Sequence, residues 1–363
     1  MAQEVQKTNH VVYISTNGQM IDIYFFRGEG WRFANFGEKH RSPLAEGNPA
    51  AFVYNVNNSQ NIVFRGHDKH IHTLFFIRGT GWANTNLTGL VGAPLAEGDP
   101  SAYTYHVFNT QHVIYRSSDN HLHQLYSAQI GNWKHADMTV QSGAPLASGR
   151  PTTYVYGMND SQNIVYRSQD GHIYTLYFVR GEGWKHVSLT GATGGPLANG
   201  DPSSYTYHVF NTQHVIYRGQ DNHIYQMYSD QTGQWKISNM TEKTGAPLAT
   251  GTPTSFVDPV HNSQNLVYRG QDGHIHDIWF IRGEGWKHMN LTAATGMPLA
   301  AGNPFGYTFD LFSTQHIMYR TQNGHLIQLY SGQPRDWKYS NLTEKTGAPI
   351  AKSDPTCYTY DLK

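Results

Sequence analysis

A 51-residue repeat without insertions or deletions constrains the fold of this chain more than any other feature. Residues 109–127 read NTQHVIYRSSDNHLHQLYS, and nearly the same phrase returns at residues 211–229 and 313–331. A tryptophan recurs every 51 residues, as Trp31, Trp82, Trp133, Trp184, Trp235, Trp286 and Trp337. Such a period indicates stacked copies of one structural unit, so we expect residues 1–363 to form a single domain of seven repeats.

Each copy contains four short segments with β-strand character. In one copy they are residues 103–107, 112–116, 121–126 and 133–138. An Asp-Gly or Asp-Asn pair between the second and third segments predicts a two-residue type I′ hairpin. A GAPLA-x-G-x-P sequence before the next copy predicts a loop shaped by proline and glycine. Aromatic residues make up 13% of the chain and charged residues only 14%. Four antiparallel strands in each of seven units predict an all-β, seven-bladed β-propeller.

The two ends of the chain predict how the ring closes. The C-terminal YTYDLK matches the first strand of the other copies, whereas the N-terminal MAQEVQ does not. We therefore expect residues 357–362 to supply the inner strand of the blade begun by residues 9–36, leaving few open sheet edges. The single cysteine, Cys357, excludes an internal disulfide framework and is interpreted as an inert thiol in a register of small residues.

Two kinds of copy alternate along the chain. Copies that read NIVFR, NIVYR or NLVYR later carry an R-G-x-G-W sequence, and copies that read HVIYR or HIMYR lack it. The first copy is a hybrid, with NHVVYIS followed by FFRGEGW. Two kinds of blade predict two kinds of groove between blades.

Charge and hydropathy exclude several classes of partner. Lys and Arg total 26, as do Asp and Glu, and the pI is about 7.4, so no net field attracts nucleic acid. The N-terminus has no apolar signal segment, and no run near eighteen apolar residues exists to insert into a membrane. We expect synthesis in the cytoplasm and release by a non-classical route.

Polar residues at a fixed register are the candidates for binding, because strand packing and turns explain the apolar, proline and glycine series. On the second strand they are His10, Asn61, His112, Asn163, His214, Asn265 and His316. Four residues later follow Arg65, Arg116, Arg167, Arg218, Arg269 and Arg320. The third strand adds Asp22, Thr73, Gln124, Thr175, Gln226, Asp277 and Gln328.

These series have structural interpretations as well. The arginines could pair with the hairpin aspartates, the tryptophans could only pack between blades, and the histidines after the hairpin could only bond the turn. Yet a groove between blades would combine an indole, amides or imidazoles, and a guanidinium. A sugar offers an apolar face for the indole and hydroxyls for the polar groups. Several weak sites on one ring gain strength through effective concentration, so the sequence predicts a multivalent carbohydrate-binding protein without cofactor or metal.

The combined repeat also resembles a known family over the whole chain. The phrases QHVIYR-x-x-D-x-HIH-x-LY and W-K-x-x-x-LT, followed by GAPLA-x-G-x-P, are similar to the seven-bladed β-propeller lectins of Photorhabdus, the PLL/PHL group or bangle lectins. The resemblance implies a non-catalytic homo-oligomeric lectin for L-fucose and O-methylated sugars, with sites between blades. Its partners would be fucosylated or methylated glycans, including host cell-surface glycoconjugates.

A more distant resemblance qualifies this expectation. Six-bladed fungal fucose lectins hold fucose with an arginine on the second strand and a glutamate twelve residues later. Here that spacing joins pairs such as Asn61/Thr73 and His112/Gln124, which predicts neutral hydrogen bonding or fewer than seven working sites.

Three other functions are alternatives. A glycoside hydrolase needs two carboxylates, usually on irregular loops, and a repeat without insertions provides no such loop. A metal site could use the H-x-H pairs that begin at His70, His121 and His274, but Tyr174 and Tyr225 interrupt that series. A protein-binding scaffold of the WD40 kind remains an alternative, although the WD dipeptide is missing.

Overall fold

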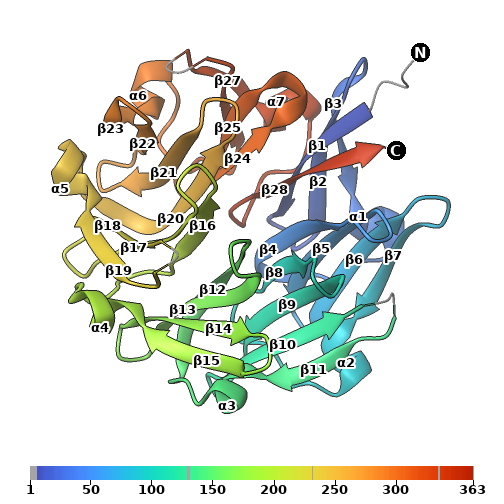
Figure 1. Ribbon diagram of the computed structural model, residues 1–363. Coiled ribbons are helices and arrows are strands. Elements are labelled where there is room, and N and C mark those ends of the chain that lie inside the picture. The colour runs from blue at the N-terminus through green and yellow to red at the C-terminus, as the bar shows by residue number, and fades with distance from the viewer. Residues whose placement is uncertain (1–5, 129–130, 231, 334–335, 363) are drawn as a thin grey trace, which may run out of the picture.

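The computed structural model describes residues 6–128, 131–230, 232–333 and 336–362. Within these residues the chain forms seven four-stranded antiparallel sheets arranged as a ring, which is a seven-bladed β-propeller (Figure 1). This architecture and the count of four strands per blade confirm the fold predicted from the repeat.

Each blade consists of four strands that pair in sequence order, except that β28 completes the first. Blade 1 contains β28 (Thr356–Leu362), β1 (Gln6–Ile14), β2 (Met20–Phe26) and β3 (Gly30–Asn35). Blade 2 contains β4 (Ala45–Tyr54), β5 (Ser59–Gly66), β6 (Ile71–Ile77) and β7 (Gly81–Asn86). Blade 3 contains β8 (Ser101–Tyr105), β9 (Thr110–Arg116), β10 (Leu122–Ser127) and β11 (Lys134–Asp137). Blade 4 contains β12 (Ala147–Tyr156), β13 (Ser161–Ser168), β14 (Ile173–Val179) and β15 (Gly183–Ser188). Blade 5 contains β16 (Ser203–Tyr207), β17 (Thr212–Arg218), β18 (Ile224–Ser229) and β19 (Trp235–Asn239). Blade 6 contains β20 (Ala249–Asp258), β21 (Ser263–Gly270), β22 (Ile275–Ile281) and β23 (Gly285–Asn290). Blade 7 contains β24 (Phe305–Phe309), β25 (Thr314–Arg320), β26 (Leu326–Ser331) and β27 (Lys338–Asn341).

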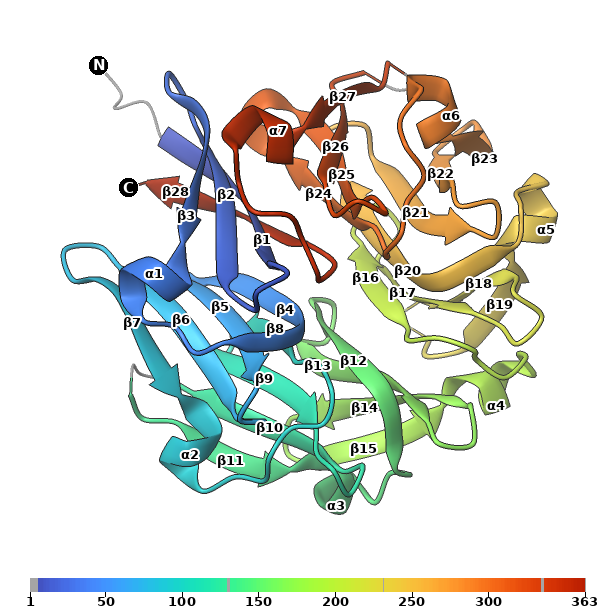
Figure 2. The same ribbon diagram turned by 180° about the vertical axis from the view of Figure 1, so that it is seen from behind.

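The C-terminal strand closes the ring as expected. Strand β28 pairs antiparallel with β1, from Gln6 opposite Leu362 to Val12 opposite Thr356. Strands β1 and β28, from opposite ends of the sequence, therefore lie side by side in the same blade (Figure 2). Cys357 is buried in the apolar cluster between blades 7 and 1, and this burial raises the pKa of its thiol well above the usual value. A protonated, buried thiol is unreactive.

The hairpin between the second and third strands differs from the predicted type I′ turn. Asn120 has a positive φ of 67°, but Asp119 before it does not. The N–H of Asn120 donates to Ser117 O at 3.0 Å, and the N–H of Ser117 donates to His121 O at 3.0 Å. These bonds define a three-residue loop whose last residue is left-handed. Asp119 Oδ1 instead accepts the N–H of His121 at 3.2 Å.

A short helix follows the outer strand of every blade and was not predicted. The described residues contain α1 (Phe36–His40), α2 (Leu87–Val91), α3 (Met138–Ser142), α4 (Leu189–Thr193), α5 (Met240–Thr244), α6 (Leu291–Thr295) and α7 (Leu342–Thr346), with a 3₁₀ turn η1 (Asp310–Phe312). In α2 the N-cap Asn86 accepts the N–H of Gly89 at 2.8 Å, and Gly92 ends the helix at φ 63°. No helix among the described residues has the length and apolar character to cross a bilayer.

The histidines that follow the hairpin contact the first turn of these helices. His70 Nδ1 lies 2.8 Å from Thr88 Oγ1, which also accepts the N–H of Ile71 at 3.1 Å. The same contact joins His172 to Thr190 and His274 to Thr292 at 2.8 Å. These imidazoles therefore tie the third strand to the start of the helix in their own blade.

The apolar core lies between blades, in seven clusters among the described residues. One cluster joins Tyr105 and Ile114 of blade 3 to Ile164 and Leu176 of blade 4, with Trp184 packed against it. Each tryptophan of the 51-residue series packs in the same way against the cluster shared with the preceding blade. All seven indoles stay partly exposed, so each has a surface left to contact a ligand.

Candidate functional site

The candidate site is the crevice between one blade and the next. In blade 4, Asn163 lies opposite Tyr177 and Thr175 lies opposite Val187 in the strand register. Side chains alternate across a strand, so all four project from the same face of the sheet. The next blade adds Gln213, Trp235 and other residues to the opposite wall of this crevice. We name each crevice by its two blades, so this one is crevice 4/5.

Two kinds of crevice alternate, and their second-strand residues define them. Blades 2, 4 and 6 present an asparagine face, which forms the asparagine crevices 2/3, 4/5 and 6/7. Blades 1, 3, 5 and 7 present a histidine face, which forms the histidine crevices 1/2, 3/4, 5/6 and 7/1. The asparagine faces carry Asn61, Thr73, Asn163, Thr175, Asn265 and Asp277. The histidine faces carry His10, Asp22, His112, Gln124, His214, Gln226, His316 and Gln328.

Three histidine crevices are filled by hydrogen bonds of the protein itself. In crevice 3/4, His112 Nδ1 accepts the Gln124 amide at 2.9 Å, and its Nε2 lies 2.7 Å from Thr110 Oγ1. The ring stacks on Tyr103 at 4.6 Å, and the Tyr103 hydroxyl donates to Gln162 Oε1 of blade 4 at 2.7 Å. The equivalent tyrosine–glutamine bonds are Tyr205–Gln264 at 2.6 Å in crevice 5/6 and Tyr358–Gln60 at 2.7 Å in crevice 1/2.

The buried imidazoles in this network are neutral. Burial lowers the pKa of His112, His214 and His316 to about 3 in each case. In crevice 1/2 a carboxyl group replaces the amide, because His10 Nδ1 lies 2.8 Å from Asp22 Oδ2. Both nitrogens of His112 are therefore used internally and are not available to a ligand.

Two asparagine crevices leave polar atoms of the neighbouring blade without partners. Phe52 and Phe256 stand where other blades have the inner-strand tyrosine, so no hydroxyl reaches Gln111 in crevice 2/3 or Gln315 in crevice 6/7. The Oε1 atoms of Gln111 and Gln315 are buried without a hydrogen-bond partner in the described part of the chain.

Crevice 4/5 stays open for a different reason. Its inner-strand tyrosine is present, and the Tyr154 hydroxyl donates to Gln213 Oε1 at 2.7 Å. The Asn163 amide donates to Ser161 Oγ within its own strand at 3.0 Å. Asn163 and Thr175 are both smaller than the His112 and Gln124 that fill crevice 3/4, so space remains between the blades.

The asparagine crevices differ in size. Crevice 4/5 encloses about 590 Å³, crevice 2/3 about 90 Å³ and crevice 6/7 about 20 Å³. Only the first falls within the range of about 300–1,000 Å³ that is usual for small-molecule sites. The lining of crevice 4/5 combines Trp235 and Tyr177 with Asn163, Thr175 and Gln213, and none of its described lining residues is charged.

Crevice 7/1 is a histidine crevice that has opened. Asn9 occupies the register of Gln60, and its side chain is shorter by one methylene group. It approaches the Tyr307 hydroxyl without a hydrogen bond of normal geometry, so that Asn9 Oδ1 and Tyr307 OH both lack partners among the described residues. A cavity of about 310 Å³ remains, lined by aromatic residues that include Trp31 and Phe312.

The predicted arginines lie apart from these cavities. The series Arg65, Arg116, Arg167, Arg218, Arg269 and Arg320 sits at the end of the second strand, and none of its members lines any of the four crevices described above. Four residues along a strand span about 13 Å, which separates each guanidinium from the amide or imidazole on the same face. Arg65 contacts Glu46 at 2.9 Å, and Arg116 donates to Asn120 Oδ1 at 2.6 Å. Arg65 therefore contacts the inner strand and Arg116 the hairpin loop of its own blade. Among the described residues, no ion pair joins an arginine of this series to a hairpin aspartate.

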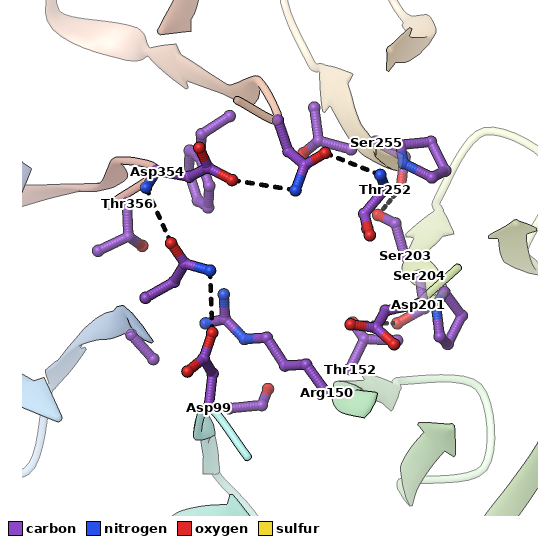
Figure 3. Close-up of a pocket in the computed structure, with 18 of the residues that line it drawn as sticks. Asp99, Arg150, Thr152, Asp201, Ser203, Ser204, Thr252, Ser255, Asp354 and Thr356 are labelled. Atoms are coloured by element: carbon purple, nitrogen blue, oxygen red, sulfur yellow. Dashed lines mark hydrogen bonds between the residues drawn. The ribbon is translucent and has the colours of Figure 1, made fainter. Parts of the chain in front are cut away.

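The centre of the ring holds a cavity of about 340 Å³ that was not predicted from the sequence (Figure 3). Its lining includes a series at the 51-residue spacing with one member from each blade: Asn48, Asp99, Arg150, Asp201, Thr252, Asn303 and Asp354. Asn48 donates to Asp99 Oδ2 at 2.9 Å and accepts the N–H of Asp354 at 2.8 Å. Asn303 likewise donates to Asp354 Oδ2 at 3.0 Å. These bonds join neighbouring blades, and burial raises the pKa of Asp201 and Asp354.

The H-x-H pairs make contacts with other side chains. No three His, Cys, Asp or Glu side chains of the described residues are grouped to hold a metal ion. His72 Nε2 instead lies 3.0 Å from Asp68 Oδ2, and His123 Nδ1 lies 3.0 Å from His135 Nε2.

Comparison with known proteins bears on the fold. No family model and no curated protein sequence matches the chain. Among solved structures, the BP39L lectin from Burkholderia pseudomallei has a TM-score of 0.75 at 12% identity, covering 95% of both chains. AofleA from Arthrobotrys oligospora has a TM-score of 0.54 at 13% identity, covering 87% of this chain and 90% of that one. A variant of the Aleuria aurantia lectin in complex with α-methyl-L-fucoside has a TM-score of 0.53 at 11% identity, covering 80% and 93%. At such identities the likeness shows a shared β-propeller fold.

Two further series of residues distinguish crevices 2/3, 6/7 and 7/1, but not crevice 4/5, from the filled crevices, and they were missed as site residues. They are the inner-strand tyrosine or phenylalanine and the glutamine one blade later. The glutamine recurs every 51 residues in six copies, and Asn9 replaces it in the first. Asn9 in place of glutamine, together with Phe52 and Phe256 in place of tyrosine, could have indicated from the sequence which crevices lack this hydrogen bond.

Proposed function

We propose that this protein is a multivalent, non-catalytic lectin that binds L-fucose or O-methylated sugars between its blades, as the Photorhabdus PLL/PHL lectins do. Crevice 4/5 carries this proposal. It combines the indole of Trp235 with the neutral polar groups of Asn163, Thr175 and Gln213, the set that a pyranose with an apolar face and a rim of hydroxyls requires.

Two further observations support the proposal. Val187 and Ala192 line the same crevice and offer an apolar surface to the methyl group of fucose or to an O-methyl group. The structural neighbours include the BP39L lectin of Burkholderia pseudomallei and the fungal lectin of Aleuria aurantia, a variant of which was solved in complex with a fucoside.

The distribution of open crevices predicts at most four working sites. They are crevices 2/3, 4/5, 6/7 and 7/1, because internal hydrogen bonds occupy the other three. The narrow crevices 2/3 and 6/7 need side-chain movement before they admit a sugar ring. The partners would be fucosylated or methylated glycans on host cell surfaces, bound by a homo-oligomer released from the cytoplasm by a non-classical route.

The test compares two tryptophans in the same register. Trp235→Ala removes the indole from the open crevice 4/5, and Trp184→Ala removes its counterpart from the filled crevice 3/4. Titration calorimetry with L-fucose should show that Trp235→Ala weakens binding about tenfold or more at one site, while Trp184→Ala keeps wild-type affinity and stoichiometry. Equal effects of the two variants, or no binding of fucose or methyl fucoside by the wild type, would refute the proposal. Turnover of aryl glycosides would contradict the absence of catalysis.

A further inference from the structure

Crevice 6/7 contains a carboxyl group where the other asparagine crevices contain a hydroxyl group. Asp277 on β22 occupies the register of Thr73 and Thr175 and is 3% exposed. It lines the crevice together with Trp279 and with Trp337 of the next blade. Trp279 lies two residues further along the strand, so it projects from the same face as Asp277.

Among the described residues, this carboxyl group has no cationic partner. Asp22 has the same register in blade 1, and there it pairs with His10 at 2.8 Å. In blade 6 the imidazole is replaced by Asn265, whose amide donates to Ser263 Oγ at 3.1 Å. Asp277 Oδ1 is left without a hydrogen-bond partner in the region that the structure describes.

The described groups around Asp277 do not supply a positive charge for it. His261 also lines the crevice, but its Nδ1 is bound to Asp258 Oδ2 at 2.6 Å. The lining residues that are described include no lysine or arginine. Gln315 Oε1 is a second buried acceptor in the same crevice without a donor. Burial therefore raises the pKa of Asp277 well above its usual value, and a ligand that brings a positive charge would reverse this shift.

The dimensions and the aromatic walls narrow the choice of ligand. The enclosed space of about 20 Å³ admits roughly one group of the size of a water molecule. An ammonium group has this size, donates three hydrogen bonds, and is attracted to indole faces. The remainder of the ligand would stay at the mouth of the crevice, where Trp337 is partly exposed.

We propose that crevice 6/7 binds the protonated amine of a free hexosamine, with Asp277 and Gln315 as acceptors and Trp279 and Trp337 beside it. This inference rests on the proposed lectin function, because it assigns a sugar to the crevice. It differs from the proposed function in the ligand, since a site built on Thr175 offers nothing that selects a cation.

The experiment uses the full chain and three matched sugars at neutral pH. Calorimetry or tryptophan fluorescence should detect binding of D-glucosamine, and at least tenfold weaker binding of D-glucose and N-acetyl-D-glucosamine, which lack the charge. Asp277→Asn removes the charge at nearly constant shape and should weaken glucosamine binding about tenfold or more, because charge-assisted hydrogen bonds are about twice as strong as neutral ones. The thermal midpoint of this variant should not fall, since the carboxyl group it removes is buried and has an oxygen without a partner among the described residues.

The controls separate this inference from the lectin proposal. Thr73→Ser, at the same register in crevice 2/3, should leave glucosamine binding unchanged. Asp277→Asn should leave L-fucose binding in crevice 4/5 unchanged, so fucose binding and glucosamine binding fail or succeed independently. Glucosamine affinity retained by Asp277→Asn, or equal binding of N-acetyl-D-glucosamine, would overturn the ammonium assignment. Equal binding of L-lysine amide would overturn the choice of a hexosamine.

Discussion

The substitution Asn9→Gln should close crevice 7/1 and stabilise the protein. In three equivalent crevices a glutamine accepts the tyrosine hydroxyl of the preceding blade at 2.6–2.7 Å. In crevice 7/1 the shorter Asn9 leaves its own Oδ1 and the Tyr307 hydroxyl without partners among the described residues. One additional methylene group lets the amide reach the hydroxyl through the existing cavity of about 310 Å³.

The expected magnitude follows from the groups involved. Pairing a buried hydroxyl that was unsatisfied recovers about 1–3 kcal/mol, and the extra methylene group adds up to about 0.8 kcal/mol when buried. For 363 residues, the entropy of unfolding is about 0.8 kcal/mol per kelvin. We therefore expect the thermal midpoint to rise by about 1–5 °C in scanning calorimetry.

A reciprocal variant tests the same reasoning in the opposite direction. Gln60→Asn in crevice 1/2 removes the partner of Tyr358 and should lower the midpoint by a similar amount. Ligand binding in crevice 7/1 should be lost in Asn9→Gln and retained in Gln60→Asn. An unchanged or lower midpoint for Asn9→Gln, with a crystal structure that shows crevice 7/1 still open, would refute the reasoning that side-chain length at this register controls the crevice.

Three other perturbations test different parts of the structure. Gln111→Leu removes an unpaired acceptor, so it should change the free energy of unfolding by less than about 1 kcal/mol while weakening sugar binding in crevice 2/3. Gln162→Leu leaves the Tyr103 hydroxyl without its acceptor and should lower the free energy of unfolding by about 1–3 kcal/mol in chemical denaturation. Acidification from pH 6.5 towards 3 should destabilise the fold, because the unfolded chain takes up protons on three histidines whose pKa is about 3 when buried, namely His112, His214 and His316. Together the three histidines should lower the free energy of unfolding by up to about 4 kcal/mol for each pH unit. The variant His214→Asn should make the thermal midpoint depend less steeply on pH. Deletion of residues 356–363 removes the strand that closes blade 1 and should abolish a single cooperative transition in circular dichroism, and an unaltered melt would show that closure does not stabilise the ring.

The ring was predictable because a repeat without insertions makes the number of copies equal to the number of blades. Strand β28 was predictable for the same reason, since the C-terminal YTYDLK matches the first strand that the first copy lacks at the N-terminus. The short helices were not predicted because five residues are too few for an apolar period of 3.6. Their caps were nevertheless present in the sequence, for example Asn86 before and Gly92 after α2.

The site was only partly predictable, because spacing along one strand does not show how far apart two side chains lie across the ring. The amide or imidazole and the arginine share a face, yet about 13 Å of strand separates them, and the arginine contacts other groups, such as Glu46 for Arg65. The inner-strand tyrosines resemble core residues in the sequence. Only the structure shows that Tyr103 crosses to Gln162 of the next blade and thereby helps to fill a crevice that Phe52 leaves without such a bond.

The hybrid character of blade 1 follows from closing an alternating pattern with an odd number of blades. If blade 1 were wholly of the asparagine kind, its face would meet the R-G-x-G-W side of blade 2, a combination found at no other junction. If it were wholly of the histidine kind, its other side would create an equally foreign junction with blade 7. The actual blade carries Trp31 of its R-G-x-G-W sequence towards blade 7 and His10 towards blade 2. Both junctions therefore repeat the histidine crevice already used at 3/4 and 5/6, and the ring closes with two kinds of crevice. Against this background the replacement of glutamine by Asn9 is a departure that packing of the repeat does not require, and it converts one of the four histidine crevices into an open site.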